Sequence, residues 1–295
     1  MHSEKRGNFL GITAILLWAT LGLFTVLTGD IPPFELVSIS FFVASFIGVI
    51  MLKVQRHSFS LLFKVPWYAW IIGITGLFGY HFFYFFAIKN APAVEANLLN
   101  YLWPLLIVLF SSLLPNEKLR WFHVIGAFLG LIGAFLLVSK NGSLALDSQY
   151  TAGYIFAILA ALTWSSYSVI SRRLAHIPTY SVTGFCMATA VLSLLCHLAF
   201  EQTVIPTTAQ LLAAIVLGLG PVGGAFYVWD YGMKGGDIKV LGSLSYFTPL
   251  LSTFLLILFS DALMTSTIVI ACVLIVCGSL ISSKEMLLNM LRNKS

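Results

Sequence analysis

Long apolar runs separated by short polar gaps make up almost the whole chain. A bilayer core needs about 20 mostly apolar residues per helix. Ten runs of this kind can be drawn, at 7–28, 33–53, 66–88, 93–114, 120–139, 152–172, 179–200, 207–233, 239–260 and 264–283. The connections between them are too short for a sizeable soluble domain. The pattern therefore predicts an all-α integral membrane protein with ten transmembrane helices.

The composition agrees with this pattern. The chain has 295 residues, of which 59% are hydrophobic and 9% are charged, against about 25% charged residues in an ordinary soluble domain. So little polar surface could not cover a soluble particle of this size. The formal net charge of +5 lies in the gaps between apolar runs, so we interpret it as a topology signal and not as a nucleic-acid-binding surface.

The basic residues predict the orientation, because loops rich in Lys and Arg stay in the cytoplasm. With the N-terminus inside, 14 of the 16 basic residues lie on the cytoplasmic side, and only Lys89 and Lys140 lie outside. The acidic residues expected on or near the outside are Asp30, Glu35, Glu95, Asp147, Glu201 and Asp261. Both termini, including a tail at 285–295, are predicted to be cytoplasmic in a multi-pass bacterial inner-membrane protein.

The chain also resembles itself at long range. Four residues recur at an offset of 145 and two at 146, namely Gly79, Lys89, Tyr101 and Pro104 as Gly224, Lys234, Tyr246 and Pro249, and Gly7 and Trp18 as Gly153 and Trp164. The predicted halves are 7–140 and 153–284, with five helices each. An odd number of spans makes the second half enter the membrane in the opposite sense. Such inverted repeats are typical of secondary transporters, with a substrate site near the midplane.

Large aromatic residues fall near the middle of several predicted helices, although Trp and Tyr usually prefer the membrane interfaces. At about 1.5 Å rise per residue, Trp18, Trp164, Tyr101, Trp103 and Tyr246 all lie roughly 11–18 Å into their spans. Any one of them could simply pack between helices. For the set, the pattern favours the lining of a central cavity.

Hydrogen-bonding residues occur at similar depth. The further candidates for substrate binding are His81, Tyr84, Asn97, Asn100, Tyr167 and Ser243. Asn97, Asn100 and Tyr101 share one face of a predicted helix through their three- and four-residue spacing. Pro104 and Pro249 each remove a backbone donor and loosen the helix locally, so they are either plain kinks or hinges for a moving helix.

Ionisable residues and motifs add little further chemistry. Glu95 and Asp230 are candidate coupling residues, although both could be solvated at a membrane interface, and His81 could be a structural residue. The cysteines and histidines show no metal-ligand spacing, and the glycine-rich stretches lack the Lys-Ser/Thr of a phosphate loop. No cofactor, metal site or ATP-driven mechanism is predicted. Glycines such as Gly126, Gly130 and Gly133 predict close helix contacts.

Four segments carry a resemblance to a known family. They are Leu17-Trp18-Ala19-Thr20, Glu95-Ala96-Asn97-Leu98-Leu99-Asn100-Tyr101-Leu102-Trp103-Pro104, Thr163-Trp164-Ser165-Ser166-Tyr167 and Ser245-Tyr246-Phe247-Thr248-Pro249. In these segments the chain resembles the ten-helix EamA type of the drug/metabolite transporter superfamily, and more narrowly its bacterial aromatic amino-acid exporters. Ala96 and Asp230 depart from the exporter pattern, which expects a glycine and a neutral residue.

The resemblance implies export of aromatic and other hydrophobic amino acids through a cavity that opens alternately to the two sides. Trp18, Tyr101, Trp103, Trp164 and Tyr246 would line this cavity. A second hypothesis keeps transport but changes the cargo to another small metabolite or an aromatic cation. An intramembrane enzyme would need paired catalytic groups, and the sequence offers none. The expected partners are a small-molecule substrate and the lipid bilayer, with no nucleic acid, in an architecture that can work as a monomer.

Overall fold

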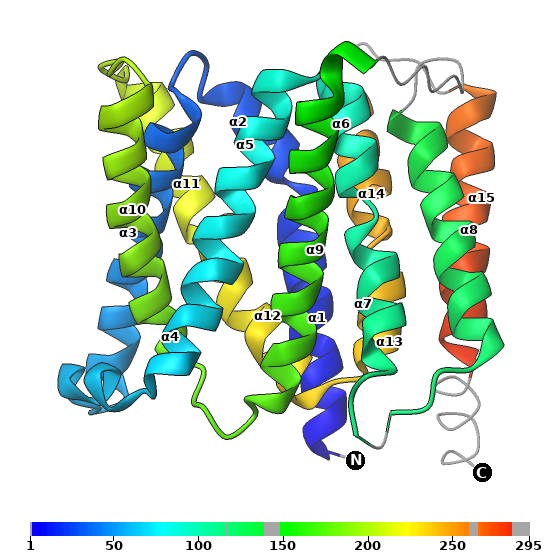
Figure 1. Cartoon of the computed structure of the whole chain (residues 1–295), viewed down its shortest axis with the longest axis horizontal. Helices are drawn as coiled ribbons and strands as arrows, with labels where there is room; N and C mark the ends of the chain where they lie inside the picture. Colours follow the sequence, from blue (N-terminus) through cyan, green and yellow to red (C-terminus); the bar gives the residue numbers. More distant parts are fainter. Residues whose placement is uncertain (1, 116, 139–147, 260–264, 285–295) are drawn as a thin grey trace.

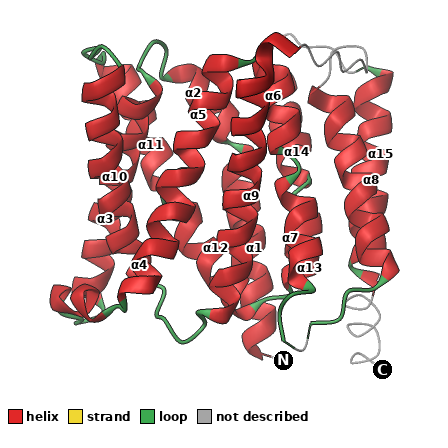
Figure 2. Ribbon diagram, in the orientation of Figure 1, coloured by secondary structure: helices red, strands yellow, loops and turns green. Residues whose placement is uncertain are grey.

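The computed structural model describes residues 2–115, 117–138, 148–259 and 265–284. Over these residues the chain forms helices and no strand (Figure 1; Figure 2). Helices suit a membrane protein because each satisfies its backbone polar groups internally, where hydrocarbon offers no partner. The predicted all-helical fold is confirmed. The predicted tail at 285–295 and the loop positions Lys140, Asp147 and Asp261 lie outside the described residues.

The predicted spans agree with the observed helices to within a few residues at most ends. The helices are α1 (His2–Ala19), α2 (Leu21–Leu27), α3 (Pro33–Val54), α4 (Trp67–Ile74), α5 (Tyr80–Asn90), α6 (Ala93–Asn100), α7 (Trp103–Ser111), α8 (Trp121–Val138), α9 (Thr151–Arg173), α10 (Ser181–Phe200), α11 (Thr208–Leu219), α12 (Gly224–Gly235), α13 (Ile238–Leu244), α14 (Phe247–Phe259) and α15 (Ser266–Ser282). Shorter helical turns are η1 (Phe59–Lys64), η2 (Thr75–Gly79) and η4 (Ser148–Tyr150).

Six helical stretches in the described part of the chain are long and apolar enough to cross a membrane. They correspond to α1–α2, α3, α4–α5, α9, α10 and α11–α12. Shorter apolar helices cover Glu95–Ser111, Trp121–Leu137 and Ser266–Ser282. The remaining predicted span, 239–260, is divided between α13 and α14. The count of ten spans therefore stays a prediction.

Figure 1 distinguishes two ends of the bundle. α1 begins at one end, where α3, α9 and α15 also finish, and we call this the N-terminal end. α2 finishes and α6 and α15 begin at the opposite end, which we call the far end. These two names carry no assumption about which side of a membrane each end faces.

Two of the interrupted helix pairs have their breaks at matching positions of the sequence repeat. Two residues separate α6 from α7, and two separate α13 from α14. Pro104 and Pro249 each lie in the first turn after the break, where a missing backbone N–H is tolerated. The prolines are 145 residues apart, which is the offset of the sequence repeat.

A further irregularity lies between α4 and α5, where η2 is a π-helical turn. Such turns are rare and occur frequently at functional sites. Here η2 joins α4 and α5 into one continuous helical stretch from Trp67 to Asn90. This helix packs against α9 along much of its length.

Glycines allow several helices to approach closely. A Cβ atom on Gly126 of α8 would overlap the backbone of Gly278 on α15. In the same way, Gly232 of α12 packs against the backbone of Gly11 on α1. The predicted role of the glycines as close helix contacts is confirmed for these pairs.

Candidate substrate cavity

A partly open cavity of about 430 Å³ lies in the far-end half of the bundle. Its walls come from α1, α2, α3, α5, α6, α7, α9, α11, α12 and α14, so helices from both halves of the sequence form it. The predicted site residues that line it are Trp18, His81, Tyr84, Asn97, Asn100, Tyr101, Trp103 and Trp164. Among the described lining residues none is Asp, Glu, Lys or Arg. The cavity is therefore aromatic and polar but uncharged.

Five aromatic side chains form a cluster at the inner limit of this cavity, which we call the aromatic floor. Its members are Trp18, Trp103, Trp164, Phe226 and Trp229, and each is at most 8% exposed. The ring centroids of Trp18 lie 6.0 Å from Trp103, 5.7 Å from Trp164 and 4.9 Å from Trp229. Phe226 lies 5.4 Å from Trp164. The floor thus joins α1, α7, α9 and α12.

Packing and hydrogen bonding hold the floor in place. Offset and edge-to-face aromatic pairs contribute about 0.5–1.5 kcal/mol each beyond the apolar area that they bury. A buried tryptophan also needs a partner for its ring N–H, and Nε1 of Trp229 donates to Oγ of Ser168 at 3.1 Å. These contacts make the floor a rigid apolar surface against which a planar group can stack.

Hydrogen bonds order the polar wall of the cavity, which α5 and α6 form. The Tyr84 hydroxyl donates to Oδ1 of Asn97 at 2.6 Å, and Nδ2 of Asn100 donates to the Tyr80 hydroxyl at 3.2 Å. The rings of Tyr80 and Tyr84 stack with 5.9 Å between their centroids. The wall therefore presents fixed aromatic edges and amide groups.

Two side chains that line the cavity each have a polar atom that could still form a hydrogen bond. Oδ1 of Asn100 and Oγ1 of Thr248 are buried and have no hydrogen-bond partner among the described residues. Both residues line the cavity. A buried polar atom without a partner costs about 1–3 kcal/mol, so each atom would gain from a polar group on a bound molecule.

His81 also lines the cavity, and the residue as a whole is 8% exposed. Its Nδ1 lies 2.7 Å from the carbonyl oxygen of Leu77. Because a carbonyl can only accept, Nδ1 carries a proton, and Nε2 of the neutral ring is an acceptor. The ring packs edge-on against Phe41 and Tyr80. His81 thus combines the predicted structural role with a place in the cavity wall.

Three predicted substrate-binding residues lie away from the cavity. Tyr246 is 0% exposed, and its hydroxyl accepts a hydrogen bond from the backbone N–H of Leu105 at 3.2 Å. Ser243 donates to Oγ of Ser282 at 2.6 Å. Tyr167 packs against Trp164 on the side of the floor that faces the N-terminal end. In this conformation Tyr246 and Ser243 bond to other helices, α7 and α15, and Tyr167 packs on Trp164 of its own helix, α9.

The contact between Tyr246 and Leu105 also concerns the prolines. Leu105 directly follows Pro104 in α7, and Tyr246 lies in the break before α14. The hydrogen bond therefore joins the two broken helices at their breaks. Pro249 lies three residues beyond Tyr246 in the same segment.

The two acidic candidates both have partners. Glu95 accepts a hydrogen bond from the Tyr154 hydroxyl, which links α6 to α9. Asp230 is 2% exposed, and its Oδ2 atom accepts from Thr179 at 2.8 Å and pairs with Lys234 at 2.7 Å. The interpretation of Asp230 as a residue solvated at a membrane interface is therefore wrong, because neighbouring segments bury its carboxylate and Lys234 and Thr179 take the place of water.

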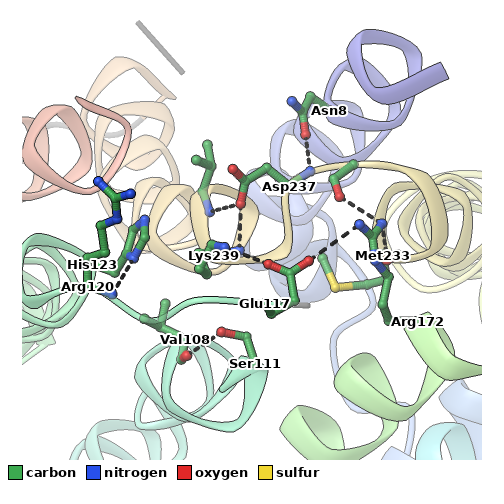
Figure 3. Close-up of polar contacts among 12 residues, drawn as sticks. Asn8, Val108, Ser111, Glu117, Arg120, His123, Arg172, Met233, Asp237 and Lys239 are labelled. Carbon is green, nitrogen blue, oxygen red and sulfur yellow. Dashed lines mark hydrogen bonds and ion pairs between the residues drawn. The ribbon is translucent and has the colours of Figure 1, made fainter. Parts of the chain in front are cut away.

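A polar network closes the N-terminal end of the bundle around α13 (Figure 3). Nζ of Lys239 lies 2.5 Å from Glu117, whose other oxygen is 3.5 Å from Arg172. Arg172 also donates to the carbonyl oxygens at the end of α12, including that of Lys234 at 2.8 Å. The backbone N–H of Asp237 donates to Asn8 at 2.6 Å. These contacts tie α1, α9, α12 and α13 together.

Several important residues were not singled out from the sequence, although the repeat contains a signal for them. Phe226 and Trp229 of the floor lie 145 residues after His81 and Tyr84, which were selected. Applying the offset to every candidate would have found both. The same rule would have found Thr248, whose counterpart is the candidate Trp103, but not Tyr80, whose counterpart is Ala225.

A family model describes this chain. The EamA-like transporter family matches residues 5–139 and 151–284. The chain belongs to this family. The resemblance predicted from the four sequence segments is confirmed, and so is the expectation of a membrane transporter rather than an enzyme.

Known members of the family are similar over nearly the whole chain. A protein of Ancylobacter novellus named "Aromatic amino acid exporter YddG" is 49% identical and covers 95% of this chain and 98% of its own length. A protein of the same name from Salmonella typhimurium is 24% identical, covering 95% and 97%. A solved crystal structure at 49% identity has a TM-score of 0.90 and covers 94% of this chain and 97% of that one.

Proposed function

We propose that this protein is a secondary transporter that exports aromatic and other hydrophobic amino acids across the bacterial inner membrane. The observation that carries the proposal is a cavity of about 430 Å³ with an aromatic floor and an uncharged polar wall. This volume is within the range of about 300–1,000 Å³ typical of small-molecule sites. The name of the relative that is 49% identical supports the same substrate class.

The walls of the cavity suit the two parts of an aromatic amino acid. The indole or phenyl side chain would stack on Trp18, Trp103 and Trp164, since flat apolar rings pack well on such faces. The amino and carboxylate groups would bond to the amides and hydroxyls of the wall, with Asn100 and Thr248 as the atoms that still lack a partner. Tyr101, which also lines the cavity, would bridge the two regions.

The proposed architecture is that of two inverted five-helix repeats, 7–140 and 153–284, around the cavity. The two separate family matches and the paired breaks before Pro104 and Pro249 support it. In this account the broken helices are the flexible elements of alternating access, because the residues at a break have fewer backbone hydrogen bonds to lose. One chain supplies all of the walls, which supports transport by a monomer.

In the proposed orientation the N-terminal end of the bundle faces the cytoplasm. The predicted inside residues are Lys5, Arg6, Lys53, Arg56, Lys64, Lys118, Arg120, Arg172, Arg173, Lys234, Lys239, Lys284, Arg292 and Lys294, and an excess of basic residues is typical of cytoplasmic loops. The cavity in the far-end half then corresponds to an outward-facing state. The polar network around Glu117 and Lys239 would be the closed cytoplasmic side.

The described contacts favour an anchoring role for Glu95 over the coupling role proposed from the sequence. Its hydrogen bond from Tyr154 attaches α6 to α9 beside the cavity. The alternative cargo is an aromatic cation, because a tryptophan face attracts cations. The uncharged cavity wall and the pairing of Asp230 with Lys234 argue against this alternative.

The proposal is tested in cells that overproduce the chain. They are expected to tolerate toxic analogues of phenylalanine, tyrosine and tryptophan, and to release these amino acids faster than cells that carry an empty vector. A panel of aromatic cations run in parallel tests the alternative cargo. Unchanged release and tolerance across the amino-acid panel would overturn the substrate assignment.

A further inference from the structure

A second, much smaller cavity lies between the aromatic floor and the N-terminal end. It has a volume of about 10 Å³, which is about the space that one water molecule requires. Its polar lining consists of Tyr167, Ser171, Ser181, Asp230 and Lys234. Unlike the large cavity, it therefore contains charged side chains.

The two cavities follow each other along the same helices. On α12, Phe226 lines the large cavity, and Asp230 and Lys234 follow it by one and two turns. On α9, Trp164 lines the large cavity, and Tyr167 follows it by three residues. Four residues correspond to about 6 Å of helix rise. A substrate moving between the floor and the N-terminal end would meet Asp230 and Lys234 next.

The ion pair in the small cavity is buried and fully engaged. Side-chain exposure is 3% for Asp230 and 10% for Lys234. Nζ of Lys234 also donates to the carbonyl oxygen of Ile177 at 2.9 Å, and Thr179 donates to Asp230. A buried ion pair is weak evidence for stability, because desolvation offsets much of the attraction. Stability alone therefore does not explain why the buried Asp230–Lys234 pair lies between the cavity and the N-terminal end.

Two hydroxyl groups point to a ligand in the same cavity. The oxygens of Tyr167 and Ser181 are buried and have no hydrogen-bond partner among the described residues. The two residues are 4% and 1% exposed. Both line the small cavity beside Asp230 and Lys234. The cavity thus combines one anion, one cation and two unpaired hydroxyls.

Resting on the proposed function, we infer that Asp230 and Lys234 form the cytoplasmic loading site for the charged head group of the amino acid. When the N-terminal end opens, the pair separates. The substrate ammonium then binds Asp230, and the substrate carboxylate binds Lys234. Each buried charge exchanges one partner for another of the same sign, so none is left unpaired. Tyr167 and Ser181 supply further hydrogen bonds to the head group.

The loading site exists in only one half of the repeat, so the two ends of the path bind the substrate differently. At the offset of 145, Lys234 corresponds to Lys89 but Asp230 corresponds to Phe85. Phe85 lines the large cavity, whose described lining carries no charge. A zwitterion therefore binds through both of its charges near the N-terminal end. In the far-end cavity it has no charged partner among the described lining residues, so it binds less tightly there and is released more readily.

The test compares three indole compounds in vesicles that contain the full chain. Tryptophan carries both charges, tryptamine lacks the carboxylate, and indole-3-propionate lacks the ammonium. The unaltered protein is expected to prefer tryptophan to either compound by at least about tenfold in kcat/KM, because charge-assisted hydrogen bonds are the strong ones. In Lys234→Met the preference over tryptamine should disappear, and in Asp230→Asn the preference over indole-3-propionate should disappear.

A double variant covers the risk that either single change leaves an unpaired buried charge and prevents folding. Asp230→Leu combined with Lys234→Met removes both charges and should fold, yet transport the three compounds at similar rates. Lys64→Met is the control, because it removes the charge of an exposed lysine in η1 and should leave the substrate ratios unchanged.

The outcomes separate this inference from the proposed function. If the unaltered protein transports tryptophan but shows no preference over the two analogues, the loading site is wrong and the exporter stands. The same holds if the folded double variant keeps the preference. If the unaltered protein moves none of the three compounds, both proposals fail.

Discussion

Two tyrosines related by the sequence repeat have different surroundings at the scale of single residues. Tyr101 lines the large cavity, whereas Tyr246 is fully buried between helices. Replacing Tyr101 by alanine should raise the KM for tryptophan about five- to tenfold, since an aromatic contact contributes about 0.5–1.5 kcal/mol beyond its area. Transport into vesicles measures this change. Trp67→Ala, on a residue that is 74% exposed, is the control, and an equal effect of both would contradict the cavity assignment.

For Tyr246 we expect the opposite outcome, a loss of stability without a loss of affinity for tryptophan. Tyr246→Phe leaves the Leu105 N–H without its hydrogen-bond acceptor, which should cost about 1–3 kcal/mol of unfolding free energy. The melting temperature in detergent should therefore fall, while the KM for tryptophan stays within about twofold of the original value, a change of less than 1 kcal/mol. A large change in KM at unchanged melting temperature would mean that the Tyr246 hydroxyl contacts substrate.

The sequence predicted the depth of these residues but not which face of the helix they occupy. Trp18, Trp103 and Trp164 reach the cavity as expected, because their helices turn the predicted face inward. Tyr246 and Ser243 do not, since their hydroxyls bond to Leu105 of α7 and Ser282 of α15 instead. The four-residue spacing of Asp230 and Lys234 is that of a helical ion pair, but its burial was beyond prediction, because the further partners Thr179 and Ile177 come from a distant segment.

At the scale of helices, one carboxylate from α10 stabilises the start of α3. Both oxygens of Glu201 lie 3.1 Å from the backbone N–H of Phe34, and one is 3.3 Å from that of Glu35. A helix start has N–H groups without internal partners and favours negative charge. The residue before α3, Pro32, provides no side-chain cap, so the distant carboxylate takes its place.

Glu201→Ala should therefore destabilise the protein by about 1–3 kcal/mol, because it removes a charged acceptor from buried donors. Thermal unfolding in detergent measures the loss. Glu4→Ala, which changes an exposed acid on α1, should have little effect. Equal melting temperatures for the two variants would show that α3 does not depend on this cap.

The extents of the helices were the most predictable feature of the fold. Apolar runs bounded by Pro, Gly and charged residues place α3, α9 and α10 to within two residues of the expected ranges. Pro104 and Pro249 indicated the breaks between α6 and α7 and between α13 and α14. The break between α11 and α12 and the π-helical turn η2 were not located in advance, because hydropathy averages over them.

At the scale of the whole molecule, the proposed orientation makes this conformation an outward-facing state with a closed cytoplasmic side. A cysteine at Thr25, which lines the large cavity, should react with a membrane-impermeant maleimide added outside intact cells, and tryptophan should slow the reaction. A cysteine at Ala175, in the exposed loop at the N-terminal end, should react only after the membrane is opened. The reverse pattern would contradict the proposed orientation.

Transport by the purified chain in lipid vesicles tests the central claim most directly. Vesicles loaded with unlabelled tryptophan should accumulate labelled tryptophan by counterflow. Phenylalanine and tyrosine should compete, and glutamate and lysine should not, because the cavity wall is aromatic and uncharged. Trp103→Ala should lose the activity while it remains folded. Accumulation no greater than in vesicles without protein, or full activity of Trp103→Ala, would contradict export through this cavity.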